Sequence, residues 1–133
     1  MVNVKEAPRT ATTIVVRSDT NNRITRSRDP YFSLMQRIFQ TNESATRGQK
    51  FLIMVEERQN VGNPIRIDEW DMILKELAVH KSSFYSMRNK LLGAGLIKIK
   101  KREYRLSTDF AKDLRDMASW WMTAIIKTED EEK

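Results

Sequence analysis

The sequence predicts a mostly α-helical protein with one small β-hairpin, which is an α+β fold. Three observations indicate it. Apolar residues recur every three to four positions through most of residues 29–95, which is the period of an amphipathic helix. Between residues 96 and 106 the period becomes two, as in a strand. After residue 107 apolar residues lie alternately four and three positions apart, as in a helix with an apolar seam.

The chain divides into three parts by composition. Residues 1–28 are rich in Thr, Asn and Arg, with one short β-like run at residues 14–16, so we expect a flexible basic arm that could form a strand in a dimer. Residues 29–127 hold the periodic segments and form one predicted domain. Residues 128–133 are an acidic tail that we expect to be disordered.

Two helices are expected at the start of the domain. Asp29 can accept hydrogen bonds from a first helical turn, and Pro30 suits the first helical position. The stretch "RGQKFLIMVEERQ" predicts a second helix, which Gly62 and Pro64 end. The alternation at residues 65–67 predicts a short edge strand. The residues expected to face the core from the two helices are Phe32, Met35, Ile38, Phe39, Phe51, Leu52, Met54 and Val55.

A pair of helices joined by a short turn is expected next. Asp68, with Asp71 three positions later, is expected to cap the first, and Ser82 or Ser83 the second. The Gly-Ala-Gly at 93–95 is expected to end the second helix. The residues expected to face inward are Trp70, Ile73, Leu74, Leu77, Phe84, Met87, Leu91 and, at the edge, Leu92.

A hairpin and a long helix complete the domain. Apolar and basic residues alternate over residues 97–106, which predicts a hairpin with one buried and one basic face. Ser107 is the expected cap of the last helix. Trp120 and Trp121 are adjacent and cannot share a face, so one is expected to meet the body or a partner helix. The heptad seam predicts dimerisation through Phe110, Leu114, Met117, Trp121 and Ala124.

The composition excludes several classes of protein. There is no cysteine and only one histidine, His80, so thiolate nucleophiles, disulfides, Cys-based zinc sites and His-pair metal sites are excluded. The carboxylates lie mostly in expected first turns or in the tail, and we find no catalytic constellation, so we expect no enzyme, no metal and no cofactor. Because no stretch of about 18 apolar residues occurs, we expect a soluble cytoplasmic protein without a membrane partner.

Positive charge is concentrated in one segment. The net charge is +6, yet residues 80–105 hold eight basic residues and one acidic residue, Glu103. The residues before this segment hold 12 basic and 10 acidic side chains, and the residues after it hold 4 and 7. A charge run alone is equally compatible with a solvated face, but its position on a helix and a hairpin favours a polyanionic partner.

The order of these elements resembles the winged helix-turn-helix family of DNA-binding proteins. The resemblance lies in "IDEWDMILKELAVHKSSFYSMRNKLLGAGLIKIKKREYRLS", where "LLGAGLI" looks like the usual passage from recognition helix to wing. The last helix resembles those of the multiple-antibiotic-resistance and phenolic-acid regulators, in which terminal helices form the dimer. The resemblance implies a recognition helix at residues 82–92 that enters the major groove and a wing at residues 97–106.

The resemblance also implies which residues contact DNA. From the recognition helix and the turn before it these are Lys81, Ser82, Ser83, Tyr85, Ser86, Arg88, Asn89 and Lys90, and from the wing Lys98, Lys100, Lys101, Arg102 and Arg105. Asn89 would contact adenine and Arg102 the minor groove. Arg88 has two open roles, a phosphate contact or an ion pair with Asp71 or Glu69. His80 is either a simple turn residue or, when protonated, a phosphate donor.

Three functional hypotheses remain open at this point. The first is a homodimeric repressor that binds a roughly palindromic site in double-stranded DNA. The second is a plasmid or viral partition, replication or architectural protein that coats DNA at the nucleoid and recruits a protein partner through the N-terminal arm or the acidic tail. The third is a winged helix that serves as a protein-interaction module. An effector pocket between Trp120, Trp121 and a partner subunit is a further option.

Overall fold

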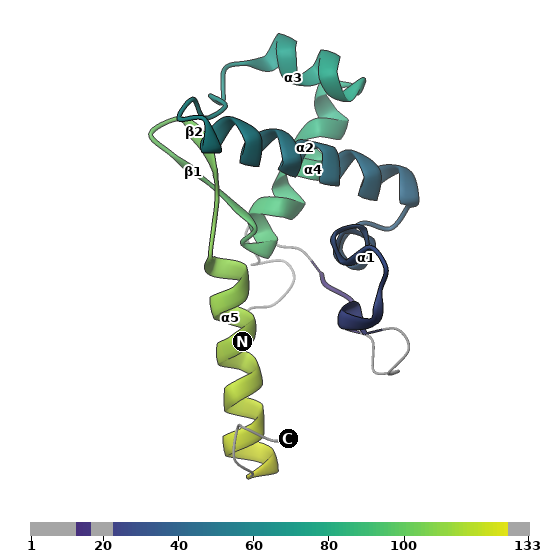
Figure 1. The fold of residues 1–133 in the computed structure, drawn as a ribbon, viewed down its shortest axis with the longest axis vertical. Helices are drawn as coiled ribbons and strands as arrows, with labels where there is room; N and C mark the ends of the chain where they lie inside the picture. Colours follow the sequence, from purple (N-terminus) through teal and green to yellow (C-terminus); the bar gives the residue numbers. More distant parts are fainter. Residues whose placement is uncertain (1–12, 17–22, 128–133) are drawn as a thin grey trace.

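The computed structural model describes residues 13–16 and 23–127, and in this part the chain forms an α+β fold (Figure 1). The helices are α1 (Pro30–Ile38), α2 (Asn42–Asn60), α3 (Trp70–Leu77), α4 (Lys81–Ala94) and α5 (Asp109–Trp120). A short 3₁₀ turn, η3 (Ile24–Arg26), precedes α1, and a π-helical segment, η4 (Trp121–Ile126), continues α5. Strands β1 (Ile97–Lys100) and β2 (Glu103–Leu106) pair antiparallel. The predicted mixture of helices and one hairpin is confirmed.

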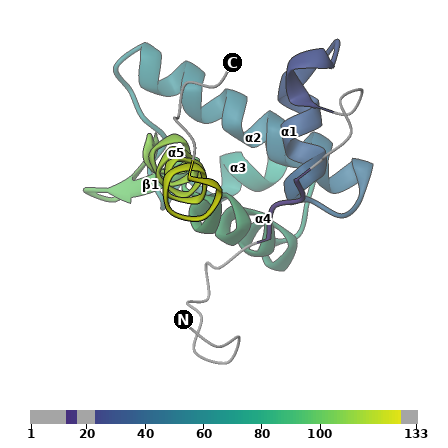
Figure 2. The ribbon, with the colours of Figure 1, turned by 90° about the horizontal axis from the view of Figure 1, so that it is seen from below.

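Helix α2 lies at the centre of the fold. In Figure 1 it crosses the molecule between α1 and the hairpin, and α5 extends away from the body, whereas Figure 2 looks along the axis of α5. Five of its residues are buried: Ala45, Gly48, Phe51, Leu52 and Val55. The Phe51 ring stands edge-on to the rings of Phe84 in α4 and Tyr104 in β2, with centroids 5.1 and 5.4 Å apart. Aromatic pairs favour this geometry, so the core joins α2 to α4 and to the hairpin.

The predicted core faces are confirmed. Met35, Ile38, Phe39, Ile73, Leu77, Met87 and Leu91 are buried, and Phe32, Met54, Trp70, Leu74 and Leu92 pack partly buried against them. The start of α1 also agrees, because Oδ1 of Asp29 accepts a hydrogen bond from the Phe32 amide at 3.1 Å and Pro30 takes the first helical position. These assignments depend on local sequence alone.

The predicted edge strand is reduced to a single bridge. Arg66 forms an isolated antiparallel bridge with Glu103. The Tyr104 amide donates to the carbonyl of Ile65 at 2.8 Å, and the Ile67 amide donates to that of Arg102 at 2.9 Å. Residues 65–67 therefore cover the outer edge of β2.

The predicted cap of α3 is wrong. The helix begins at Trp70, with Glu69 at the cap position and no side-chain capping bond. The Glu69 carboxylate is engaged elsewhere, since it accepts from the Arg66 amide at 2.8 Å and from both terminal nitrogens of Arg58 at 3.0 and 3.2 Å. Asp68 lies 3.4 Å from Arg66 instead of capping. The Arg58–Glu69 pair fastens the end of α2 to the start of α3.

This pair predicts a loss of stability in acid. The pKa of Glu69 is lowered from 4.5, first by the hydrogen bond from Arg58. A carboxyl with a depressed pKa stabilises the fold above its unfolded pKa and loses that contribution as pH falls through its folded pKa. Glu69→Gln should therefore lower the free energy of unfolding by about 1–2 kcal/mol at pH 7, and the difference from wild type should vanish well below pH 4.5.

Urea unfolding of both proteins at pH 7 and pH 3 measures this difference. Glu57→Gln, which removes an exposed carboxylate from the same end of α2, is the control and should change stability little. A Glu69→Gln deficit that persists undiminished at pH 3 would show that the ion pair is not its cause.

Two predicted segments lie largely outside the described residues. Of the predicted N-terminal arm, residues 13–16 and 23–28 are described, and Ile14 packs against the core while the Val15 amide donates to the carbonyl of Arg37 at 3.0 Å. Residues 14–16 are not assigned to a strand. The predicted acidic tail at residues 128–133 lies wholly outside.

Candidate nucleic-acid interface

Helix α4 begins earlier and ends later than predicted. It begins at Lys81, so His80 takes the cap position, and the His80 side chain makes no capping bond. The expectation that Ser82 or Ser83 caps the helix is wrong. The turn is short because Ala78 ends α3 in the left-handed conformation, with φ 53°, and only Val79 and His80 separate it from the first residue of α4. At the other end the helix continues to Ala94, and Gly95 ends it with φ 81°.

The outward face of α4 is small and polar. Phe84, Met87 and Leu91 are buried in the core, as expected from their spacing. On other sides of the helix, Ser82, Ser83 and Ser86 are exposed, and Asn89 and Lys90 are half-buried. Such a face allows another molecule to approach closely.

Two predicted contact residues on this helix are held by the Trp70 ring. The Tyr85 ring lies 4.8 Å from that of Trp70, and the Lys81 ammonium lies 5.0 Å from the same ring. Trp70 thus ties the first turns of α4 to α3. The tie restrains the angle between the two helices and keeps Tyr85 half-buried.

Arg88 adopts neither of its two predicted ion pairs. Its guanidinium lies over the Tyr85 ring, 4.5 Å from the centroid, and Nη2 donates to Oδ1 of Asn89 at 3.2 Å. The carboxylate of Glu69 is bound to Arg58 instead. An arginine can only donate, so Asn89 turns its amide oxygen toward Arg88 and its NH₂ group away from it. Arg88 is therefore placed to orient Asn89.

Arg88 and Tyr104 bring two buried polar atoms to the junction of α4 and the hairpin. Within the described part of the chain, Nε of Arg88 and the hydroxyl of Tyr104 are both buried without a hydrogen-bond partner. Burial raises the pKa of Tyr104, and the Arg88 guanidinium acts in the opposite direction. The hydroxyl therefore stays protonated at neutral pH.

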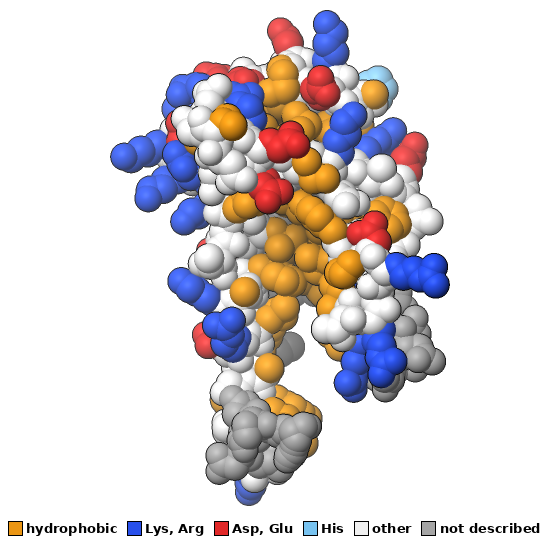
Figure 3. Space-filling view, viewed as in Figure 1, with side chains coloured by type: hydrophobic (Ala, Val, Ile, Leu, Met, Phe, Trp, Pro, Cys, Tyr) orange, Lys and Arg blue, Asp and Glu red, His pale blue; other side chains and the backbone are white. Residues whose placement is uncertain are grey.

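The hairpin has the predicted basic face. Its register pairs Lys98 with Arg105 and Lys100 with Glu103, and paired residues share one face. Ile97 and Tyr104 face the core on the other side. Lys and Arg side chains gather at this end of the molecule, at the upper left of Figure 3.

Carboxylates of the described residues form ion pairs with the hairpin arginines but not with the hairpin lysines. Nη2 of Arg105 lies 2.8 Å from Oε1 of Glu103, and Nη2 of Arg102 lies 4.0 Å from Oδ2 of Asp68. Among the residues that the structure describes, no carboxylate forms an ion pair with the hairpin lysines, which are Lys98, Lys100 and Lys101. The lysines therefore offer the least compensated positive charge.

The tip of the hairpin holds its cations in an unusual backbone conformation. Lys101 and Arg102 connect two paired residues and have φ values of 52° and 64°. A two-residue turn with both φ values positive is a type I′ turn, in which Asn-Gly is the preferred sequence. Non-glycine residues are strained there by about 1–2 kcal/mol each. The protein thus keeps two long cationic side chains where Asn and Gly would be less strained.

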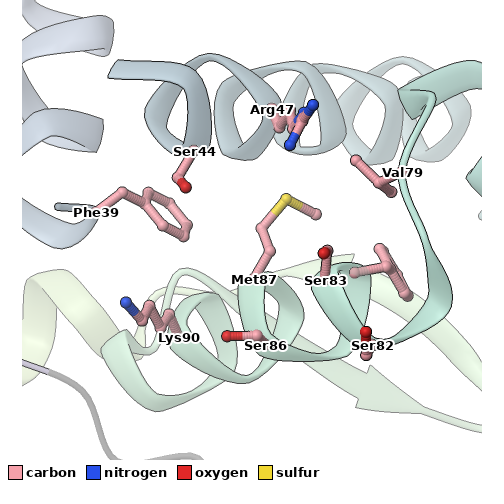
Figure 4. Close-up of a pocket in the computed structure, with 10 residues that line it drawn as sticks. Phe39, Ser44, Arg47, Val79, Ser82, Ser83, Ser86, Met87 and Lys90 are labelled. Atoms are coloured by element: carbon pink, nitrogen blue, oxygen red, sulfur yellow. The ribbon is translucent and has the colours of Figure 1, made fainter. Parts of the chain in front are cut away.

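A pocket between α2 and α4 adds residues that the sequence analysis did not predict. It has a volume of about 310 Å³, and Arg47 and Ser44 of α2 line it opposite Ser82, Ser83 and Lys90 of α4 (Figure 4). The sequence contained no sign that Arg47 and Ser44 lie opposite the serines of α4, because the two helices are far apart in the chain. Their proximity depends on the packing of α2 against α4.

Helix α5 carries the predicted apolar seam on a largely exposed surface. None of its residues is buried, and the exposed fractions of Met117, Trp120 and Trp121 are 53, 59 and 52 %. Leu114 is 38 % exposed and Phe110 is half-buried at the root of the helix, where its amide donates to the carbonyl of Gly95 at 3.0 Å. The described residues thus leave both tryptophans without cover.

The π-helical segment changes the end of this seam. In a π-helix the hydrogen bond joins residues five apart, so each turn contains more residues than in an α-helix. The positions one turn beyond Trp121 are accordingly Ile125 and Ile126, both 47 % exposed, whereas the heptad spacing selected Ala124. Ala124 is also exposed.

No helix among the described residues has the length and apolar character to cross a bilayer. In the same residues no three His, Asp or Glu side chains form a cluster that could hold a metal.

No curated protein and no solved structure matches the chain. A family model described as an archaeal family matches residues 28–127, which are 100 of the 133 residues, and the chain therefore belongs to that archaeal family.

Proposed function

We propose that the protein is a homodimeric, double-stranded DNA-binding protein of the winged helix-turn-helix type, acting as a transcriptional repressor in the cytoplasm. In this proposal α3 and α4 form the helix-turn-helix, α4 is the recognition helix, and the β1–β2 hairpin is the wing. The observation that carries the proposal is the succession of a helix with a small polar face and a hairpin with a basic face. These are the two surfaces needed for base edges and for phosphates.

The contacts divide between the two surfaces. Asn89, whose NH₂ group points away from Arg88, can donate to acceptors of a purine edge in the major groove. The hairpin lysines, Lys98, Lys100 and Lys101, would neutralise phosphates, and Arg102 would exchange its 4.0 Å pairing with Asp68 for the DNA. Releasing so long an ion pair between exposed side chains costs little.

Helix α5 supplies the proposed dimer interface, where it packs against α5 of a second copy of the chain. The seam repeats with heptad spacing, so two copies of the helix can interdigitate about a two-fold axis. The tryptophans and isoleucines at its end are about half exposed in the single chain. A two-fold dimer would present two copies of α4 to successive major grooves, about 34–36 Å apart.

Salt dependence of duplex binding tests the proposal. Because wing cations of both protomers would displace counterions from DNA, we expect the affinity to fall by about 10³-fold between 50 and 200 mM salt. Fluorescence anisotropy with a random duplex pool, followed by sequencing of the retained DNA, measures the affinity and the preferred site. Absence of binding at 50 mM salt, or binding that salt does not weaken, would overturn the proposal.

A charge-matched control separates the wing from general positive charge. Lys98→Gln with Lys100→Gln should reduce the slope of log affinity against log salt by about 1.8 for each protomer. Lys112→Gln with Arg115→Gln removes the same charge from the exposed surface of α5 and should leave the slope nearly unchanged. Protection of a single palindrome in a footprint supports a repressor, whereas protection that spreads along the duplex supports a DNA-coating role.

A further inference from the structure

The pocket between α2 and α4 has the chemistry of an anion site. Its volume of about 310 Å³ lies at the lower end of the range for small-ligand pockets, about 300–1,000 Å³. The serine hydroxyls of both helices and the cations Arg47 and Lys90 line it, and none of the carboxylates that the structure describes does so. In Figure 4, Ser44 and Arg47 lie on the α2 side of this space and the other serines and Lys90 on the α4 side, with Met87 between them.

The hydroxyl of Ser44 is arranged to donate. Oγ1 of Thr41 donates to Oγ of Ser44 at 2.9 Å while accepting from the Ser44 amide at 3.1 Å. Because the Ser44 oxygen already accepts, its own proton remains available for a group in the pocket. The adjacent end of α4 also contributes, since the His80 side chain makes no capping bond to the first-turn amides.

The two cations are held near the pocket by weak contacts. Nη2 of Arg47 lies 3.2 Å from Oε2 of Glu43, one turn earlier on the exposed surface of α2. Such a pair contributes about 0.3–0.5 kcal/mol and is easily exchanged for an anion. The Lys90 ammonium lies 5.8 Å from the centre of the Phe39 ring.

The position of Phe39 depends on a glycine of α2. A Cβ on Gly48 would lie 2.5 Å from Cε2 of Phe39, so only glycine lets the ring pack against the helix at this point. The buried ring forms one wall of the pocket, together with Val79 and Met87. The pocket is therefore shaped by the core and not by mobile surface side chains.

We propose that this pocket is a phosphoryl-binding site and that its occupant is a phosphate of the DNA backbone. The inference rests on the proposed function and adds α2 as a third contact region, outside the helix-turn-helix and the wing. It also assigns Ser82, Ser83 and Ser86 to contacts with the DNA backbone, because these serines line the same pocket. Recognition of base edges by α4 then depends on the face of the helix that carries Asn89.

Single substitutions test the site on duplex DNA. Arg47→Gln should reduce the salt slope by about 0.9 and weaken binding to all sequences about equally, because a phosphate contact carries no sequence information. Arg115→Gln on α5 is the matched control, and it should change neither the salt slope nor the affinity for DNA. Glu43→Gln removes the one ion pair that Arg47 forms with the described residues, and it should tighten binding more in the wild type than in Arg47→Gln, because a gain from net charge alone would be the same in both.

A titration with inorganic phosphate distinguishes a site for free phosphate from a site for a phosphate of duplex DNA. Titrated into the ¹⁵N-labelled protein, it should shift the amide signals of Ser44, Ser82 and Ser83 in the wild type but not in Arg47→Gln. If wild type binds duplex DNA and Arg47→Gln matches Arg115→Gln, the site is overturned while the proposed function stands. If wild type binds no duplex but phosphate shifts these amides, DNA as the source is overturned together with the proposed function. No phosphate shift overturns the phosphoryl site.

Discussion

Replacing Lys101 by Asn and Arg102 by Gly is expected to stabilise the protein and at the same time weaken its binding to DNA. Both positions have positive φ, where Asn and Gly are favoured and longer side chains are strained. We expect the free energy of unfolding to rise by about 1–2 kcal/mol. The same change removes two exposed cations, so the salt slope should fall by about 1.8 for each protomer.

Thermal unfolding and anisotropy titrations over a range of salt concentrations measure the two effects. The control is Lys101→Gln with Arg102→Gln, which removes the charges but keeps side chains in the strained turn. It should weaken DNA binding as much as the Asn-Gly variant and should not raise the stability. If the Asn-Gly variant binds DNA as tightly as wild type, the tip of the hairpin does not contact the duplex.

A second large effect is expected at the end of α5. Ile125→Asp or Trp121→Asp should raise the dissociation constant of the dimer by about 100-fold or more, because each would bury an unpaired carboxylate against the partner helix. Neither residue is buried in the single chain, at 47 and 52 % exposed, so the monomer should keep its fold. Sedimentation equilibrium gives the dissociation constant, and circular dichroism checks the helical content.

The neighbouring residue provides a matched control for this prediction. Ala124→Asp introduces the same charge one position away. If η4 keeps its π-helical geometry in the dimer, Ile125→Asp should be the more disruptive, whereas an α-helical heptad predicts the reverse order. A wild-type protein that is monomeric at tens of micromolar would contradict a dimer formed through α5.

Local patterns were sufficient for most of the fold. The period of 3.6 identified the inward faces of α1 to α4, since burial of one helical face depends on residues three and four apart. The alternation over residues 97–106 identified both strands and their basic face, because neighbouring strand residues point to opposite sides. The start of α1 followed from Asp29 and Pro30, which act on the next turn of the same chain.

Cap positions were less predictable because they depend on competing partners. Asp68 has the right chemistry for a cap, but Arg66 and Arg102 lie near it in space. Glu69 likewise binds Arg58, eleven residues away. A carboxylate adopts the position in which the strongest donors reach it, and two of these donors, Arg58 and Arg102, come from other parts of the fold.

The sequence by itself determined the helices, the hairpin, the apolar faces and the segment in which positive charge gathers, because each depends on residues within a few positions of one another. Only the tertiary structure decided that Arg47 and Ser44 of α2 face the serines of α4, that Arg88 lies over Tyr85 and orients Asn89, and that Trp120 and Trp121 are both uncovered. The physical reason is that these relations arise from the packing of separate elements against a shared core, which no local period encodes.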